Sequence, residues 1–288
     1  MLKLSEDRWM VYFGGRDAAN QSRLFVAELD PARLEIRTVH QAPALDIGAP
    51  GAFDESGVGP GTAIDMGDKI RLYYPGIRLR DDVPYEICIG VAESTDGGKT
   101  FQRLQTEPVL CTNPKSPLGA TSPTVYRTED GWEMYYSSFF EWRDVDGKLE
   151  PIYDIHRATS PDGFTWTPDD VPTLGLADQS EGGLARAQIL QSSSGHLMIA
   201  TGRGWRDFRG AQAGAYRLIF ARSEDGVTWT RDQTAVTIEE PSHAPHWASE
   251  MRCYPWIVSD EDRILVFFNG NNFGRDGFGV GELRADAS

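Results

Sequence analysis

Four carboxylates in the sequence are candidates for acid–base chemistry, because each stands where a strand-like segment begins. Asp54 and Glu55 precede SerGlyValGlyPro, Glu181 precedes GlyGlyLeuAlaArg, and Glu250 precedes MetArgCysTyrPro. Such side chains can act as general acid, general base or nucleophile. If they converge, like-charge repulsion raises the pKa of at least one of them, which suits a general acid. The competing interpretation of each is a solvated surface carboxylate of an acidic protein.

Arginine, aromatic and amide side chains occupy the same parts of the sequence. Aromatic faces stack on the C–H surfaces of sugars, and guanidinium and amide groups hydrogen-bond their hydroxyls. The arginines could also pair with the acids, or hold a phosphate or carboxylate of the substrate. The predicted substrate-binding residues are Arg78, Trp142, Arg186, Arg203, Trp205, Arg252, Tyr254, Asn271 and Asn272.

Metal and cofactor motifs are weak in this sequence. His243, His246 and Glu250 form a possible ligand set, but Pro245 argues against a helix that would align the two imidazoles. The glycine-rich segment 269–279 follows no strand-to-helix pattern and is not a nucleotide-binding signature. We predict neither a metal nor a cofactor, and we interpret His156 as a packing residue inside a blade.

The elements that carry these residues are repeated. SerThrAspGlyGlyLysThrPhe from Ser94, SerProAspGlyPheThrTrp from Ser160 and SerGluAspGlyValThrTrp from Ser223 recur at steps of 66 and 63 residues. Each follows a strand-like run, and Asp-Gly before Thr-aromatic indicates a tight turn between two strands. Pro60, Pro123, Arg186 and Arg252 keep a similar step, and we expect each to open a strand.

The repeats predict an all-β fold, a five-bladed β-propeller with four-stranded antiparallel blades, forming one domain over residues 1–288. The five repeats cover about 1–40, 50–110, 118–175, 180–238 and 248–285. The fifth lacks an outer strand after Leu283, so we expect the N-terminal segment to complete it. Within a repeat, the long loops all fall on one face, and we expect that face to carry the site.

Composition limits the partners. Of the 288 residues, 28 are Lys or Arg and 43 are Asp or Glu, which gives a net charge of −15. Such a surface repels phosphate backbones and anionic membranes, so we predict a small-molecule ligand and neither nucleic acid nor membrane. Cys88, Cys111 and Cys253 fit no disulfide or metal pattern. We expect buried free thiols and a cytoplasmic location without a signal peptide.

The C-terminal motifs carry a resemblance to a known group. SerGluMetArgCysTyrPro (249–255) and ValPhePheAsnGlyAsnAsnPheGlyArgAspGlyPheGly (266–279) resemble propeller proteins related to the arabinanase, levansucrase and invertase glycosidases. PheAspGluSerGlyValGlyPro (53–60) and GlyLeuAlaArg (183–186) point the same way. The resemblance covers nearly the whole chain from Phe53 and implies a five-bladed fold and a carbohydrate-like ligand.

The resemblance does not carry over the family's catalytic set. The family glycosidases place one acid on the innermost strand of each of the first three blades, whereas here repeat one opens with LeuLysLeuSer and repeat three with ThrSerPro. Three hypotheses therefore stay open. The first is a glycosidase-like enzyme with Glu250 as general acid and Asp54 or Glu55 as base or nucleophile. The second is phosphorolysis, cyclisation or isomerisation at the arginines, and the third is saccharide binding without catalysis. The sequence leaves the substrate and the oligomeric state open.

Overall fold

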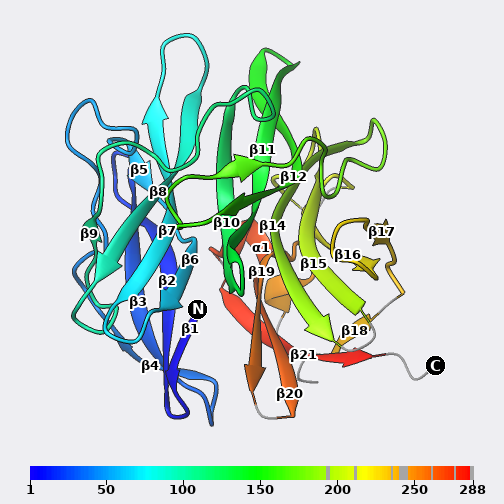
Figure 1. Ribbon diagram of the computed structural model, residues 1–288. Coiled ribbons are helices and arrows are strands. Elements are labelled where there is room, and N and C mark those ends of the chain that lie inside the picture. The colour runs from blue at the N-terminus through cyan, green and yellow to red at the C-terminus, as the bar shows by residue number, and fades with distance from the viewer. Residues whose placement is uncertain are drawn as a thin grey trace. The chain divides into compact units, whose positions relative to one another are not determined.

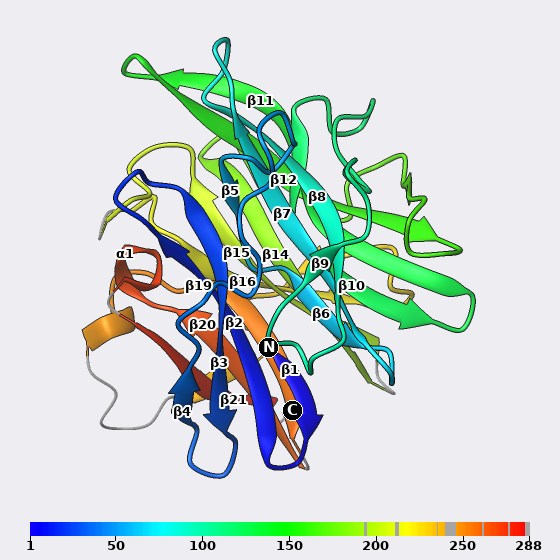
Figure 2. The ribbon, with the colours of Figure 1, turned by 90° about the vertical axis from the view of Figure 1, so that its left-hand side faces the viewer.

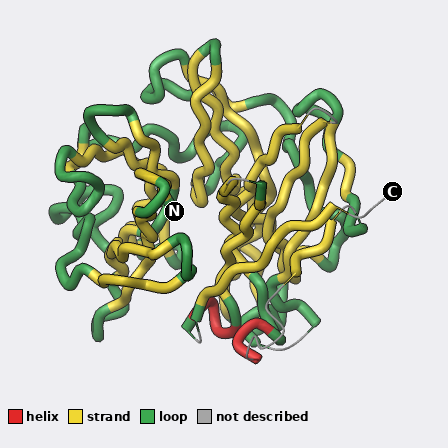
Figure 3. The backbone as a smooth tube through the Cα atoms, turned by 90° about the horizontal axis from the view of Figure 1, so that it is seen from below, coloured by secondary structure: helices red, strands yellow, loops and turns green. Residues whose placement is uncertain are grey.

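The computed structural model describes residues 1–192, 195–210, 213–234, 236–239, 246–260, 262–275 and 277–285. Strands form most of this part of the chain, and its helical segments are η1 (His246–Ala248) and α1 (Asn271–Gly274) (Figure 3). The prediction of an all-β chain is confirmed. Neither of these short helices has the length or the run of apolar residues needed to cross a membrane.

The chain divides into two compact units, which are described separately. The first unit holds Met1–Met134, Ser138–Phe140 and Ala158–Pro168. The second holds Tyr135–Ser137, Glu141–Arg157 and Asp169–Ser288. Figure 1 shows the strands of both units in chain colours.

The first unit begins with a four-stranded antiparallel meander in which each strand pairs with the next along the chain (Figure 2). A second meander of the same order follows it. The strands of the first are β1 (Leu2–Ser5), β2 (Arg8–Arg16), β3 (Ser22–Asp30) and β4 (Glu35–Val39). Those of the second are β6 (Thr62–Asp65), β7 (Ile70–Leu79), β8 (Tyr85–Ser94) and β9 (Gln102–Arg103), with the short β5 (Gly57–Val58) ahead of them.

The next group of strands contributes residues to both units. Its strands are β10 (Gly119–Thr128), β11 (Gly131–Val145), β12 (Lys148–Ser160) and β13 (Thr167–Pro168). β12 and β13 pair antiparallel across the turn that follows Ser160. Pro123 lies inside β10, and Arg186 lies inside a later strand, β14 (Glu181–Ser192). The expectation that these two residues open strands is wrong.

The second unit contains two more antiparallel groups. The first is β14 (Glu181–Ser192), β15 (Gly195–Gly204), β16 (Arg217–Ser223) and β17 (Thr230–Arg231), paired in chain order. The other consists of β18 (Val236–Glu239), β19 (Cys253–Asp260), β20 (Arg263–Asn269) and β21 (Phe278–Ala285). Because β18 pairs with β21, the fourth strand of the last group comes from Val236–Glu239. The expectation that the N-terminal segment supplies this fourth strand is wrong, since β1 pairs with β2 in the first strand group.

Successive groups are joined by the same contact. Single parallel bridges link Ser22 to Gly57, Ile87 to Gly119 and Tyr153 to Gly183, each from a third strand to the start of the next group. The amide of Arg252 donates to the carbonyl of Tyr216 at 3.2 Å in the corresponding place. The repeat seen in the sequence is thus a repeat of structure, with the core of each unit built from alternating apolar strand residues.

The three Asp-Gly segments form the predicted turns. In each turn the serine hydroxyl donates to the aspartate two residues later, at 2.7 Å in Ser94–Asp96, 3.0 Å in Ser160–Asp162 and 2.9 Å in Ser223–Asp225. The aspartate also accepts backbone N–H groups from the residues that follow, such as Phe164 and Thr165. These turns connect β8 to β9, β12 to β13 and β16 to β17.

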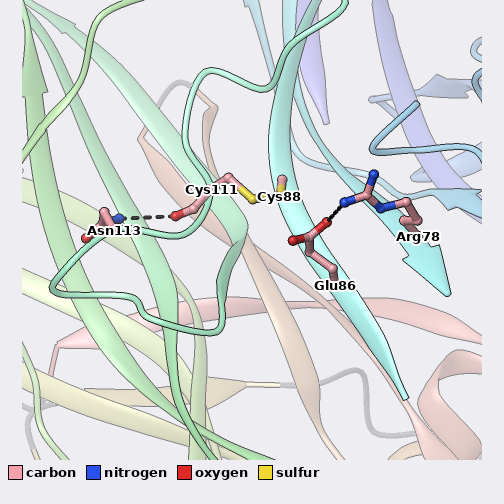
Figure 4. The surroundings of a disulfide bond; sticks show 5 residues. All are labelled: Arg78, Glu86, Cys88, Cys111 and Asn113. Atoms are coloured by element: carbon pink, nitrogen blue, oxygen red, sulfur yellow. Dashed lines mark hydrogen bonds and ion pairs between the residues drawn. A yellow bond between two sulfur atoms is a disulfide. The ribbon is translucent and has the colours of Figure 1, made fainter. Parts of the chain in front are cut away.

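Two of the three cysteines form a disulfide (Figure 4). Ile89 and Leu110 make an antiparallel bridge, which sets Cys88 and Cys111 opposite each other across it. The prediction of free thiols is wrong for this pair and confirmed for the buried Cys253. The error arose because the return of the chain beside β8 is a tertiary contact between residues 23 positions apart. The cytoplasmic location stays a prediction, although disulfides persist mainly in oxidising compartments.

Candidate functional site

Asp54 is a fully buried carboxylate held by an arginine. Its Oδ2 accepts from Nε and Nη2 of Arg103 at 2.8 and 2.7 Å, and from the Tyr74 hydroxyl at 2.9 Å. Arg103 also donates to the carbonyl of Asp46 at 2.6 Å. The guanidinium on β9 therefore fastens the connection between the first two strand groups. Its neighbour Glu55 accepts the amide of Gly51 at 2.6 Å.

Glu181 has the same kind of partner in the second unit. Nη1 and Nη2 of Arg231 lie 2.7 Å from its two carboxylate oxygens, and Nη2 also donates to the carbonyl of Gly175 at 2.9 Å. The amide of Ala177 donates to Glu181 at 2.7 Å. Arg231 on β17 thus fastens the connection into β14, as Arg103 fastens the connection into the second group.

Glu250 differs from these acids because its side chain is exposed while its backbone is fixed. Oδ1 of the buried Asn271 accepts the amides of Glu250 and Met251 at 2.9 and 3.0 Å. The carbonyl of Glu250 accepts from Arg217. Asn271, predicted to bind substrate, holds the segment that leads into β19.

Five residues of the second unit form what we call the tyrosine–arginine cluster: Tyr153, Arg186, Arg203, Tyr216 and Tyr254. They come from β12, β14, β15, β19 and the residue before β16. The phenols of Tyr153 and Tyr216 are 3.0 Å apart, and the ring of Tyr216 lies 5.7 Å from that of Tyr254. Phe208 and Phe273 pack edge-on against Tyr216. The cluster therefore joins strand residues to Phe208, which follows β15, and to Phe273 of α1.

Arg203 is buried at one end of this cluster. It donates from Nε to the Tyr153 hydroxyl at 2.9 Å and from its terminal nitrogens to the carbonyls of Gly204 and Pro151. Its guanidinium stacks on Phe208 at 4.0 Å. Because the Tyr153 oxygen accepts from Arg203, its own proton is available to Tyr216. The result is a fixed row of hydrogen bonds that leads toward Tyr254.

Arg186 and Tyr254 occupy equivalent backbone positions in two first strands. Both have left-handed φ values, 51° and 56°, at register breaks in β14 and β19. The Thr201 hydroxyl accepts the Tyr254 amide at 2.8 Å. A left-handed residue other than glycine costs about 1–3 kcal/mol and persists where the surrounding structure fixes it, often at a functional site. The bulges thus hold two side chains capable of binding a ligand.

Burial dominates the electrostatics of the cluster. It raises the pKa of Tyr216 and Tyr254 well above the ordinary value of 10.0, so both phenols are protonated near neutral pH. It lowers the pKa of Arg186 to about 10, which leaves the guanidinium charged. Burial also raises the pKa of the Cys253 thiol to about 12. The cluster therefore presents phenol donors beside positive charge.

The remaining predicted binding residues have varied surroundings. Arg78 pairs with Glu86 on the neighbouring strand of the first unit (Figure 4). Trp205 is half-buried, with the guanidiniums of Arg206 and Arg143 over its ring at 4.1 and 5.5 Å. Arg252 donates from Nε to the carbonyl of Ala248 at 3.4 Å. Trp142 is half-buried on β11, and Asn272 is an exposed residue of α1 with a φ of 53°.

The sequence predicted part of the cluster. Arg186, Arg203 and Tyr254 were predicted, whereas Tyr153, Tyr216 and Thr201 were not. Tyr216 ends the long loop after β15, and that position was its one available signal. Tyr153 and Thr201 lie within strands, and nothing in their spacing separates them from core residues.

No metal centre forms in the part of the chain that the structure describes. Among those residues, no three His, Cys, Asp or Glu side chains lie close enough to hold a metal ion together. Two of the candidate ligands, His243 and the side chain of His246, lie outside the described residues.

Comparisons with solved structures identify the fold. All of this chain superposes on 86% of a BT0996 structure in complex with RGII, with a TM-score of 0.73 and 16% identity. It also matches a thermostable family-43 glycoside hydrolase (TM-score 0.65, 15% identity, 99% of this chain and 87% of the other). A Bombyx mori GH32 β-fructofuranosidase in complex with sucrose gives a TM-score of 0.69 at 14% identity, over 99% of this chain and 58% of the other. The protein therefore has the fold of propeller-type glycoside hydrolases.

No protein-family model matches the sequence. Two curated Mycobacterium tuberculosis proteins do, the uncharacterized proteins Rv1502 and MT1551, each 30% identical over 280 residues, or 96% of this chain and 88% of the relative. This protein belongs to the same family as Rv1502.

Proposed function

We propose that the protein is one five-bladed propeller domain and a glycosidase-like enzyme that binds a small saccharide at the tyrosine–arginine cluster. Two observations support the blade count, namely the similar antiparallel strand groups and the bridges that recur between them. The likeness to glycoside hydrolase structures supports the saccharide. Fold likeness alone does not specify chemistry, so the proposal depends on the site.

The observation that carries the proposal is the fixed hydrogen-bonded row from Arg203 through Tyr153 to Tyr216, next to Tyr254. Aromatic faces with hydroxyl donors at their edges match the mixed apolar and polar surface of a sugar ring. Arg203, Tyr153 and Tyr216 are buried, and Arg203 and Tyr153 lie within strands. The row therefore fixes the position of Tyr254, whose half-buried phenol is a preorganised donor for a ligand.

Glu250 is the acid best placed to serve this site. Its backbone carbonyl and that of Tyr216 both accept from Nη1 of Arg217, which ties the two segments together. Its carboxylate is exposed, whereas those of Asp54 and Glu181 are bound by arginines. We assign Glu250 as the general acid.

The test is turnover of a panel of aryl glycosides and small oligosaccharides by the Glu250→Gln variant. Removing a general acid lowers kcat by about 10²–10⁴-fold, and least for substrates whose leaving group needs no protonation. Glu107→Gln, at an exposed acid of the first unit, is the control. Unchanged turnover by Glu250→Gln on a substrate that the protein hydrolyses would remove Glu250 from the mechanism.

Saccharide binding without catalysis is the second candidate. The arginine partners of Asp54 and Glu181 favour it, because carboxylates fixed in ion pairs are poor acids and bases. Calorimetric binding of a saccharide that yields no product on long incubation, with or without phosphate, would support this candidate. Product formed only with phosphate would instead indicate phosphorolysis.

A further inference from the structure

Positive charge gathers in the tyrosine–arginine cluster, although the chain as a whole carries a net charge of −15. The hydrogen bonds that Arg203 donates reach a phenol and two backbone carbonyls, which are neutral acceptors. By contrast, Arg71, Arg103 and Arg231 each bind a carboxylate. The nearby Arg209 is balanced by Glu150, with contacts of 2.5 and 2.7 Å.

Arg186 brings a second guanidinium to the same place. The Tyr254 phenol and the Cys253 thiol are among the groups that influence its pKa, and both are protonated near neutral pH because burial raises their pKa. The guanidinium itself keeps its charge, since its pKa is lowered to about 10. Both arginines of the cluster are therefore charged under physiological conditions.

The backbone fixes where this charge is presented. β14 and β19 lie side by side, and the Gln188 side chain accepts the amide of Ile257 at 3.4 Å to link them. Arg186 and Tyr254 are the left-handed residues of the two bulges, so both side chains leave their strands at matching positions. Both residues are half-buried, which leaves part of each accessible to a ligand.

A guanidinium beside a phenol hydroxyl matches an oxyanion better than a neutral hydroxyl. Carboxylate and phosphate oxygens accept from both groups, and hydrogen bonds between charged partners are roughly twice as strong as neutral ones. A neutral sugar can accept from the same donors, but it brings no charge of its own. Its hydrogen bonds in this low-dielectric site are therefore the weaker ones.

We propose that the saccharide bound by this protein carries an anionic substituent, a carboxylate or a phosphate monoester, and that Arg186 and Tyr254 bind it. This inference rests on the proposed function, because it names the class of saccharide that the same site accepts. The row through Arg203, Tyr153 and Tyr216 supports the position of Tyr254.

The experiment compares matched ligands by isothermal titration calorimetry. The pairs are methyl β-D-glucuronide against methyl β-D-glucoside, galacturonate against galactose, and glucose 6-phosphate against glucose, with inorganic phosphate as a probe of the anion site alone. We expect the anionic member to bind about 10–100-fold more tightly, as one or two charge-assisted hydrogen bonds allow. Which anionic member binds distinguishes carboxylate from phosphate.

Variants of Arg186 and Tyr254 test whether these residues cause the preference for the anionic ligand. Arg186→Gln should reduce the preference for the anionic ligand to about 2-fold or less, and Arg186→Lys should keep part of it because the charge remains. Tyr254→Phe should weaken anionic ligands more than neutral ones. Arg263→Gln removes an exposed arginine that pairs with Asp260 in the same unit, and is the matched control. Thermal unfolding of each variant identifies any that fail to fold.

Each outcome decides between the two claims. Anionic and neutral sugars that bind equally well, in the wild type and in Arg186→Gln, would overturn the anionic substituent and leave the proposed function standing. Inorganic phosphate that binds through Arg186, with no sugar bound, would support the anion site and overturn the saccharide. If neither phosphate nor any sugar of the panel binds, both claims fail.

Discussion

Glu181 and Arg231 form a two-pronged ion pair, with both terminal nitrogens of the arginine 2.7 Å from the carboxylate oxygens. Arg231 reaches back to the carbonyl of Gly175, and Arg103 makes the corresponding contacts to Asp54 and the carbonyl of Asp46. In both strand groups, an arginine on the outer strand therefore binds the segment that leads into the group. This explains why acids occur at the starts of these groups without requiring that all of them act in catalysis.

Glu181→Gln should destabilise the protein by about 1–3 kcal/mol, because the half-buried Arg231 loses its charged acceptor. The measurement is the free energy of unfolding from urea titration. Glu239→Gln, at a mostly exposed pair with Arg284, should change that free energy by less than about 1 kcal/mol. A Glu181→Gln variant with wild-type stability and no turnover would instead show a catalytic role.

Asp54→Asn should be the more damaging change, at about 3–5 kcal/mol, since the carboxylate that it removes is fully buried and is the charged partner of the half-buried Arg103. Urea unfolding of Asp54→Asn, Arg103→Gln and the double variant provides the measurement. The double variant should lose less than the sum of the single variants, because the pair acts as one interaction. Asp68→Asn, at an exposed turn, is the control, and strict additivity would contradict the pairing.

Thiol titration should find one free cysteine in the denatured chain without reductant and three with it. Cys253 should react slowly in the native protein at pH 8, because burial raises its pKa to about 12 and the thiolate is the reactive form. The Cys88→Ser, Cys111→Ser double variant should lose about 3 kcal/mol, as expected for a loop of this length. Three thiols titrated without reductant would contradict the disulfide.

Stability should fall in acid through the aspartate turns. Backbone N–H groups of Thr165 and Phe164 lower the pKa of Asp162 from 3.8 to about 2, and Asp96 has a similarly lowered pKa. A carboxylate with a lowered folded-state pKa stabilises the protein above its unfolded pKa, and this contribution disappears as the pH falls toward 2. Urea unfolding from pH 6 to pH 2.5 should therefore decline most below about pH 4.

Asp162→Asn tests the source of that decline. The variant should be less stable than the wild type at pH 6, and the difference should shrink as the pH approaches 2, where the wild-type carboxylate is protonated too. A difference that stays constant over this range would indicate that the side-chain shape matters and its charge does not. Asp130→Asn, at an exposed turn between β10 and β11, serves as the control.

The sequence by itself determined the all-β class, the repeats and the Asp-Gly turns. Asp-Gly turns and alternating apolar residues are local signals, so Ser94, Ser160 and Ser223 mark the same turn in sequence and in structure. Arg186, Tyr254 and Glu250 were also among the site residues that the sequence predicted. Turns and strand patterns depend on residues that are adjacent in the chain, so they can be predicted from the sequence.

Only the tertiary structure decided which side chains meet. Cys88 forms a disulfide with Cys111, and Val236–Glu239 is the fourth strand of the last group. Arg231 forms an ion pair with the carboxylate of Glu181. Tyr153 and Tyr216 also meet across 63 residues of sequence. Such contacts follow from how whole strands pair and how connections return along them, and no local pattern encodes them.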